Sequence, residues 1–298
     1  MACQPTVDNP PAPTDATAQR LKRDVAMLAE RLVPRDAAHP QNLRAASEYI
    51  AATFKAAGLT PHMQRIEAAG DYVNVIASLG PAEAPRFVIG AHYDAAGPYP
   101  GADDNASGVA GLLELARRLA RKTFTLRVDL VAFCLEEPPH FGLDTMGSHS
   151  YARRLRREGA KVEAMLSLEM IGYFADADGS QRYPHPAFKV LYPSRGNFIA
   201  VVGRWQETAL VRRTVRAMRR ASPLPVEGFN GPASTPGLAL SDHASFWAAG
   251  YKAAMVTDTA FLRNPHYHTA HDTPDTLDYR RMAHVIDGLT AAIVAAAR

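Results

Sequence analysis

One stretch decides how this chain folds: residues 90–108, with the sequence GAHYDAAGPYPGADDNASG. It follows the apolar run 86–91, which is typical of a buried strand, and it leads into residues 109–120, whose apolar positions recur with helical periodicity. A histidine and three aspartates therefore lie between the end of a strand and the start of a helix. In an open α/β sheet, ligands bind in the crevice at that position.

The polar residues of this stretch are suited to metal binding. If the backbone is still extended after the strand, the side chains of His92 and Asp94 share one face. Imidazole is the commonest metal ligand in proteins, and a carboxylate can orient it by accepting its other N–H. Asp104 adds an oxygen donor that could bridge two cations. Taken alone, His92 could equally be a hydrogen-bonded histidine at a strand end, and helix capping remains our interpretation for Asp103 or Ser107.

Length and composition limit the class of protein. A chain of 298 residues forms one large domain or two ordinary ones, and 47% hydrophobic with 21% charged residues is ordinary for a globular protein. The net charge is only +3, and the arginines are distributed over several helices. We therefore expect solvated helix faces and no nucleic-acid partner. No apolar stretch is long enough for a transmembrane segment.

The two cysteines indicate no cysteine zinc site and no disulfide framework. Cys134 lies in an apolar run and is expected to be a buried thiol. Cys3 follows Met-Ala and precedes a segment rich in proline, which resembles the start of a mature bacterial lipoprotein. We therefore expect a flexible tail over residues 1–16 and a lipid anchor at Cys3 in the native precursor. The location would then be the cell envelope, the periplasm or outside the cell, with the cytoplasm as the alternative.

Strands and helices alternate along the rest of the chain. Residues 86–92 are expected to pair back against residues 71–79 as a hairpin, and the proline- and glycine-rich segments 176–195 and 227–240 are expected to be surface loops that wall a cleft. The predicted strands are 71–79, 86–92, 125–135, 162–170, 198–203 and 252–258, and the predicted helices are 18–33, 42–57, 109–120, 148–158, 207–221, 241–250 and 276–298. This alternation predicts a three-layer α/β/α sandwich with a mixed, largely parallel central sheet.

Further candidate ligands lie where other predicted strands end. Glu136 and Glu137 are adjacent and point in different directions, so one can bind a metal while the other holds a water; an exposed surface pair is the alternative. Glu169 lies within an apolar strand, where a carboxylate must be paired or coordinate a metal. His268 lies in a loop after the last predicted strand. With His92 and Asp104, these donors suit a dinuclear Zn²⁺ site with an open position, its metals about 3.5–4 Å apart and sharing one carboxylate.

The order of these motifs resembles the M28 family of zinc metallopeptidases, which includes bacterial and fungal aminopeptidases. The resemblance covers roughly residues 70 to 290 and rests on five motifs: His92-Tyr-Asp94, residues 101–108, Glu136-Glu137, residues 168–172 and residues 267–273. It implies the zinc-exopeptidase, phosphorylase/hydrolase-like fold, with residues 17–298 forming a single catalytic domain. It also implies that His92 and Glu169 hold one zinc, that Glu137 and His268 hold the other, and that Asp104 bridges them.

The resemblance implies roles for other residues as well. Glu136 would be the general base, Tyr267 a hydrogen-bond donor to the oxyanion, and Asp94 the carboxylate that orients the neighbouring histidine. The peptide bond between Asp104 and Asn105 would be cis. Two further histidines receive no such role: we interpret His243 as structural or cleft-lining, and His271 as part of a loop.

The function implied is hydrolysis of the N-terminal peptide bond of a peptide with a free N-terminus. Zinc would lower the pKa of bound water to about 7, and Glu136 would accept its proton and pass it to the leaving amine. Three alternatives remain at this point. One is a glutaminyl cyclase-like acyltransferase with a single zinc, another an M20-type carboxypeptidase or amidohydrolase, and the third a binding protein that keeps the fold without the chemistry.

Overall fold

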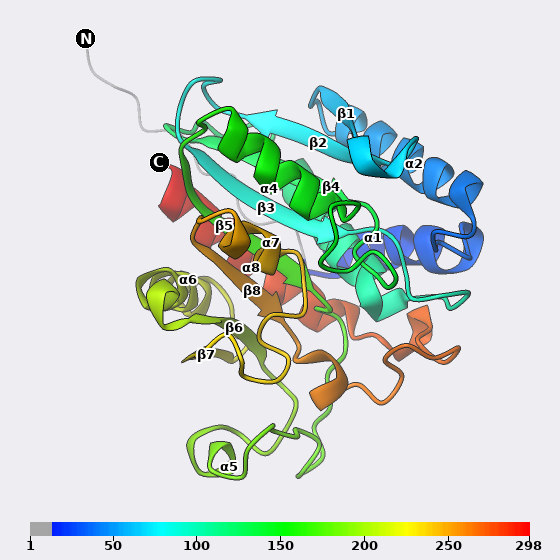
Figure 1. Ribbon diagram of the computed structural model, residues 1–298. Coiled ribbons are helices and arrows are strands. Elements are labelled where there is room, and N and C mark those ends of the chain that lie inside the picture. The colour runs from blue at the N-terminus through cyan, green and yellow to red at the C-terminus, as the bar shows by residue number, and fades with distance from the viewer. Residues whose placement is uncertain (1–13) are drawn as a thin grey trace.

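A computed structural model describes residues 14–298 and contains one eight-stranded mixed sheet within that range (Figure 1). The strands lie side by side in the order β1-β2-β4-β3-β5-β8-β6-β7. Neighbours from β4 to β8 are parallel, whereas β1, β2 and β6 introduce antiparallel pairs. The strand bounds are β1 Pro61–Arg65, β2 Val73–Leu79, β3 Arg86–His92, β4 Arg127–Phe133, β5 Val162–Glu169, β6 Ile199–Arg204, β7 Val226–Gly231 and β8 Ala253–Thr257.

Helices cover both faces of this sheet, as Figure 1 shows. One face packs against α1 (Thr14–Ala26), α2 (Pro40–Ala56), α3 (Gly108–Leu119), α6 (Thr208–Ala221) and α8 (Tyr279–Ala297). The opposite face packs against α4 (Gly147–Arg157) and α7 (His243–Ala248), and the short helix α5 (Phe188–Leu191) lies in a loop. The predicted α/β/α sandwich with a mixed, largely parallel sheet is therefore confirmed.

The central strands are buried on both faces because their side chains alternate between the two helical layers. In β3, Phe87, Ile89 and Ala91 belong to the larger core, whereas Val88 belongs to the core beneath α4 and α7. Such a continuous apolar run is typical of a parallel strand between two layers. Cys134, directly after β4, is a buried free thiol as predicted.

The predicted hairpin between residues 71–79 and 86–92 is wrong. β4 lies between β2 and β3, pairing antiparallel with the first and parallel with the second. A strand that is buried on both faces needs a partner along each edge, and β3 finds these in β4 and β5. The connection over residues 80–85 is long enough to pass the end of one intervening strand.

Two strands and the start of one helix also differ from prediction. Residues 227–240 were expected to be a loop, but β7 occupies Val226–Gly231 and pairs with β6. Strand β1 was not predicted at all. Both are edge strands with little alternation of apolar residues, so pairing in the folded chain overrides their weak strand propensity. Helix α1 begins at Thr14, so residues 14–16 of the expected tail are helical; the rest of that tail, with Cys3, lies outside the described residues. Over residues 14–298, no helix is both long and apolar enough to cross a membrane.

Candidate metal centre

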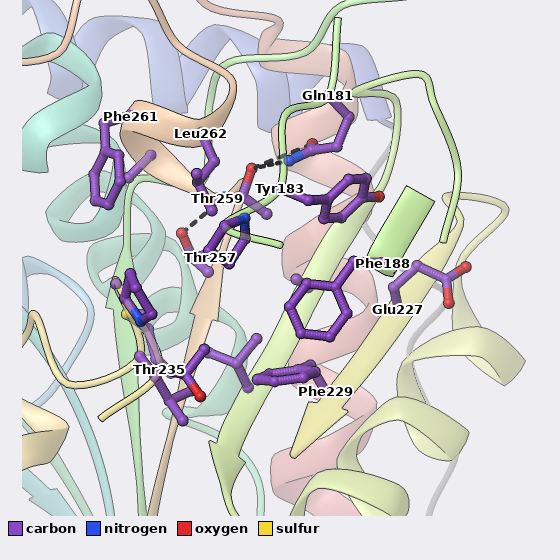
Figure 2. Close-up of a pocket in the computed structure, with 18 of the residues that line it drawn as sticks. Gln181, Tyr183, Phe188, Glu227, Phe229, Thr235, Thr257, Thr259, Phe261 and Leu262 are labelled. Atoms are coloured by element: carbon purple, nitrogen blue, oxygen red, sulfur yellow. Dashed lines mark hydrogen bonds between the residues drawn. The ribbon is translucent and has the colours of Figure 1, made fainter. Parts of the chain in front are cut away.

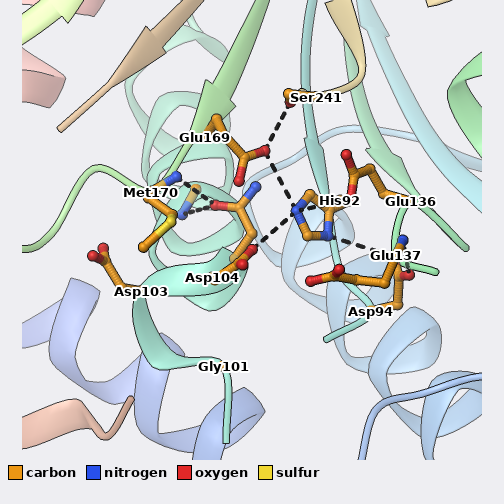
Figure 3. A network of polar contacts seen from close by, with 12 residues as sticks. His92, Asp94, Gly101, Asp103, Asp104, Glu136, Glu137, Glu169, Met170 and Ser241 are labelled. Atoms are coloured by element: carbon orange, nitrogen blue, oxygen red, sulfur yellow. Dashed lines mark hydrogen bonds and ion pairs between the residues drawn. The ribbon is translucent and has the colours of Figure 1, made fainter. Parts of the chain in front are cut away.

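The parallel strands bring the predicted ligands together at one edge of the sheet. His92 is the last residue of β3 and Glu169 the last residue of β5, while Glu136 and Glu137 follow the end of β4. His268 comes from the loop after β8. Because β4, β3, β5 and β8 are neighbours and run in the same direction, their carboxyl ends converge. Figure 3 shows the side chains of Glu169, Glu136 and Glu137 around His92.

Asp104 reaches this edge from the turn Ala102–Ser107, which precedes α3. The peptide bond between Asp104 and Asn105 is cis, as the resemblance implied. The Asn105 side chain donates to the Leu168 carbonyl at 2.8 Å and accepts from the backbone N–H groups of Gly108 and Met170, each at 3.1 Å. The turn is therefore tied to the end of β5, which holds the Asp104 carboxylate in the centre of the cluster.

Each oxygen of the Asp104 carboxylate faces a different histidine. Its Oδ1 lies 3.3 Å from His92 Nε2, which is also 3.4 Å from Glu169 Oε2. Its Oδ2 lies 3.0 Å from His268 Nε2, which is also 3.4 Å from Glu137 Oε2. The five predicted ligands thus form two groups of one histidine and two carboxylates, with Asp104 common to both.

Several buried atoms of this cluster lack hydrogen-bond partners within residues 14–298. They include both ring nitrogens of His92, one oxygen each of Asp94 and Glu137, and Nε2 of His268. Leaving buried polar atoms unpaired is costly unless another group satisfies them. A cation fits this requirement, because neutral imidazole and carboxylate are the ligands of borderline metals such as zinc. The chemistry of the cluster therefore suits a metal ion.

The charges of the cluster perturb one another strongly. Burial, with the nearby Asp104, raises the pKa of Glu137 to about 7. Burial disfavours the charged form of His268, but the close carboxylates of Asp104 and Glu137 raise its pKa to about 10. Burial opposes ionisation of Asp104 too, yet the close imidazoles of His268 and His92 hold its pKa below the usual range. Without a metal, protons balance the negative charge of these carboxylates.

Glu136 lies at the edge of the cluster, with its Oε2 3.8 Å from His92 Nε2. Burial raises its pKa well above the ordinary value, and the carboxylates of Glu169 and Glu137 raise it further. A raised pKa suits a carboxyl that accepts a proton and passes it on during a reaction. Glu136 also forms a three-residue group with His92 and Glu137, so proximity alone would allow it to be a ligand.

Asp94 connects the loops after β3 and β4. Its Oδ1 is 3.5 Å from Nδ1 of His92, and its Oδ2 accepts a hydrogen bond from the backbone N–H of Glu137 at 2.9 Å. The Asp94 carboxylate is thus placed to orient the His92 ring and to hold the backbone of Glu137, a predicted ligand of the second zinc. This position matches the orienting role that the resemblance implied for Asp94.

Two supporting residues were not predicted. The Ser241 hydroxyl donates to Oε2 of Glu169 at 2.7 Å. The Asp272 carboxylate accepts hydrogen bonds from the backbone N–H groups of Asp103 and Asp104, at 2.9 and 3.0 Å. Ser241 lies two residues before His243 and Asp272 directly follows His271, but nothing in the local sequence shows which distant residue each side chain contacts.

The capping interpretation of Asp103 and Ser107 is wrong, because neither side chain accepts a hydrogen bond from an N–H group of α3. The Asp103 carboxylate accepts from the N–H of Gly172 at 2.9 Å and from the Asn264 amide at 2.8 Å. The Ser107 hydroxyl donates to the Asp103 carbonyl and accepts from the N–H of Ile171. Both side chains therefore tie the Asp104 turn to neighbouring segments.

Tyr267, His243 and His271 lie in different surroundings. Tyr267 stacks on the His268 ring with centroids 3.8 Å apart and an interplanar angle of 17°. Burial raises the pKa of its hydroxyl, so this group stays protonated and can donate a hydrogen bond. His243 is buried outside the cluster, where its Nε2 lies 2.7 Å from the Leu238 carbonyl oxygen, in keeping with a structural role. His271 is exposed in its loop.

An apolar cavity of about 120 Å³ opens beside the cluster (Figure 2). Glu169 and Tyr267 form its end nearest the metal ligands. The other walls are mainly aromatic and come from both segments that were expected to wall a cleft, from β6 and β8, and from the loop after β8; they include Tyr183, Phe188, Tyr192, Phe198, Phe229 and Phe261. A cavity of this size accommodates one large apolar side chain, since a cavity of about 150 Å³ binds benzene.

The model of Peptidase family M28 matches residues 74–293 of this chain. The chain belongs to Peptidase family M28. The resemblance found from the motifs is thereby confirmed, and family membership makes the chain a peptide hydrolase of the metallopeptidase type. It also favours M28 over the M20-type alternative.

Curated relatives agree with this assignment. The protein YfbL of Escherichia coli K12, itself uncharacterized, is 45% identical over 289 residues, which is 94% of this chain and 88% of that protein. A probable leucine aminopeptidase of Trichophyton verrucosum is 30% identical over 231 residues, which is 70% of this chain and 53% of that protein. The chain thus spans about half the length of the fungal leucine aminopeptidases that it matches.

Solved structures share the fold at low sequence identity. The LapA aminopeptidase of Legionella pneumophila has a TM-score of 0.73 at 19% identity, covering 99% of this chain and 78% of that one. BSAP, a zinc aminopeptidase from Bacillus subtilis, has a TM-score of 0.72 at 16% identity, covering 95% and 96%. A glutaminyl cyclase from Fimbriiglobus ruber has a TM-score of 0.67 at 22% identity, covering 98% and 99%. The same architecture therefore carries two reaction types.

Proposed function

We propose that this peptidase is an aminopeptidase that uses two zinc ions per chain. The observation that carries the proposal is the placement of Asp104, whose two oxygens face two separate histidine–carboxylate pairs. One zinc would be held by His92 and Glu169, the other by Glu137 and His268, with Asp104 shared. When bound, zinc would supply Lewis-acid chemistry, lowering the pKa of a water and polarising the scissile carbonyl.

The residues of the chain supply the proton transfers in this proposal. Glu136, with its raised pKa, would accept a proton from the attacking water and donate it to the leaving amine. The protonated hydroxyl of Tyr267 would donate a hydrogen bond to the oxygen that becomes negative in the transition state. Asp94 would keep the His92 ring oriented throughout.

The cavity supports a preference for substrates whose first residue is large and apolar. Its aromatic walls begin at Glu169 and Tyr267, so a substrate held at the metal site would place its first side chain there. The α-ammonium group would lie among the carboxylates of the cluster, of which Glu136 and Glu169 are candidates. The leucine aminopeptidase relatives carry names that agree with such a substrate.

The test is a zinc titration of the metal-free protein, scored with aminoacyl-4-nitroanilides and their N-acetylated counterparts. The proposal expects activity to rise to a maximum at two zincs, to favour leucine or phenylalanine, and to disappear on acetylation. Glu136→Gln should bind zinc without turnover, and Leu143→Ala, an exposed change outside the cavity, serves as the matched control. Two bound zincs without turnover on any of these substrates would reject the aminopeptidase reaction.

A glutaminyl cyclase-like reaction is the second candidate, because a cyclase of similar length shares the fold. It would use a single zinc and release ammonia from glutaminyl substrates. The shared position of Asp104 favours two metals and therefore the peptidase. The lipid anchor at Cys3, the location in the cell envelope and the single catalytic domain stay predictions.

A further inference from the structure

Helix α6 concentrates positive charge on one side of the molecule. It carries five arginines and no acidic residue, whereas the whole chain has a net charge of only +3. The remainder of the chain therefore has a net charge of −2, which is +3 minus the +5 of this helix. All five arginines are exposed. A charge asymmetry of this kind indicates an anionic partner rather than general solubility.

Three of these arginines form an unpaired row. Arg212, Arg216 and Arg220 are spaced four residues apart, so they follow one another along one face of the helix. No ion pair joins any of them to an acidic residue within residues 14–298, whereas Arg213 and Arg219 contact Glu163 and Glu227. The row is thus free to bind negative groups from outside the chain.

Exposed apolar side chains adjoin this row. Trp205, directly before α6, is 64% exposed, and Val190 and Leu191 of α5 are 87% and 73% exposed. Trp205 and Leu191 line the same open groove as the three arginines, next to the free edge of β7. Figure 1 shows α5, α6 and β7 at one end of the sheet. Three large apolar side chains left in water beside a basic row indicate a surface that is covered when it functions.

We propose that this docking face, formed by α5, Trp205 and α6, binds the surface of a bilayer rich in anionic phospholipid. Lipid phosphates would contact the arginine row, and the apolar side chains would enter the boundary between headgroups and acyl chains. Tryptophan favours that boundary because its ring is apolar while its N–H is polar. A nucleic acid would account for the arginines but not for Val190 and Leu191. The inference does not depend on the proposed peptidase reaction.

The test is sedimentation of the 298-residue chain with vesicles of phosphatidylcholine, with and without one third phosphatidylglycerol. We expect binding only to the anionic vesicles, and weaker binding at high salt. Changing Arg212, Arg216 and Arg220 together to Gln should weaken binding about 100-fold, since each basic residue near a charged membrane contributes about fivefold and the three contributions multiply. Changing Leu191 and Trp205 together to Ser should weaken binding at least tenfold.

Helix α4 offers a matched control on the opposite face of the sheet. Changing Arg153, Arg156 and Arg157 to Gln removes the same charge from three exposed arginines, two of which contact Asp144 and Glu67, and should leave binding unchanged. Equal unfolding temperatures across the variants would show that folding is intact.

Four results would overturn the proposal. The first is that the unaltered chain does not bind anionic vesicles, and the second is that the α4 variant loses as much vesicle binding as the α6 variant. The third is that changing Leu191 and Trp205 leaves vesicle binding unchanged. The fourth is that light scattering shows a dimer that the α6 substitutions break. Binding of a DNA duplex that depends on the arginine row but not on Leu191 and Trp205 would instead assign the face to nucleic acid.

Discussion

The metal centre and the apolar cavity adjoin one another, yet they are built in opposite ways. The ligands of the metal centre are almost all buried, and they lie at the ends of β3, β4 and β5, in the turn before α3 and in the loop after β8. The cavity walls come largely from irregular segments and from the edge strand β7, and several of its aromatic side chains are only partly buried. The sheet therefore determines where the chemistry occurs, whereas the loops determine which side chain is admitted.

This division predicts that changes in the two regions separate metal binding from substrate preference. Residues of the cluster are held by hydrogen bonds from distant segments, so altering one should affect metal binding or the chemical step for every substrate. Residues of the cavity contact one another through edge-to-face ring packing, as Phe188 and Phe229 do at 5.3 Å. Altering these should change the ranking of substrates and leave the metals in place.

The largest effect is expected from Asp104→Asn. The substitution keeps the shape of the side chain but removes the negative charge that both ligand groups share. We expect the chain to bind fewer than two zincs and to lose activity on all substrates, as measured by metal analysis and nitroanilide turnover. Asp178→Asn, an exposed carboxylate that pairs with Arg195, is the control and should retain both. Two tightly bound zincs in the Asp104 variant would contradict the shared-ligand geometry.

Glu136→Gln is expected to lower kcat by about 10²- to 10⁴-fold, the usual contribution of a general acid–base group. Zinc stoichiometry should not change, because Glu136 lies at the edge of the cluster, 3.8 Å from the His92 ring nitrogen. Titration calorimetry alongside kinetics distinguishes the two roles that the geometry allows. If the variant loses a zinc, Glu136 is a ligand and another group is the base.

Zinc affinity should rise steeply with pH. Zinc binds neutral imidazole and carboxylate, but without metal His268 keeps its proton up to a pKa of about 10 and Glu137 up to about 7. Between pH 6 and 8 the zinc held by Glu137 and His268 must displace the His268 proton throughout and the Glu137 proton below pH 7. We expect the affinity for this zinc to increase about 10³-fold over this range, measured by competition with a chelator of known pH dependence. A flat profile would show that these protons are absent.

Ser241→Ala should weaken metal binding by about 10- to 100-fold, the usual effect of removing a residue that orients a ligand. The Ser241 hydroxyl donates to Glu169 at 2.7 Å, so its loss frees one ligand of a single zinc. Ser245→Ala is the matched control, because that buried hydroxyl contacts Ser148 instead. Equal losses in both variants would indicate a general defect in packing around α7.

The sequence predicts the residues that local patterns mark, and it does not predict those whose role depends on distant contacts. His92 and Glu169 could be placed because apolar runs end at them, and Asp104 because it lies in a distinctive string before a helix. Ser241 and Asp272 could not, since their partners lie 72 and about 170 residues away. Strand order depends on such distant contacts too, which explains why the predicted hairpin was wrong.

The edge strand β7 shows most clearly what could not be predicted from the sequence. The segment 226–231 contains two glycines and an asparagine, which disfavour a strand, so its pairing with β6 could not be inferred locally. Its Gly228 lies close to α6, where an added Cβ would come within 3.2 Å of Val215. Phe229 belongs to this strand and lines the cavity. Because the strand could not be predicted from the sequence, this wall of the cavity could not be predicted either.

The smallest effect is therefore expected in the cavity, from Phe229→Ala. Removing this ring enlarges the cavity at the side formed by β7, so substrates beginning with phenylalanine or leucine should lose about tenfold in kcat/KM, and those beginning with alanine should be unaffected. Zinc affinity should stay unchanged, because the ring packs against Phe188 and Tyr192 and belongs to none of the ligand groups. Phe261→Ala, on the opposite wall beside Tyr267, should produce a comparable loss if both walls hold the same side chain. A uniform loss over all substrates would mean that the cavity and the metal centre are coupled, and that the division between sheet and loops does not hold.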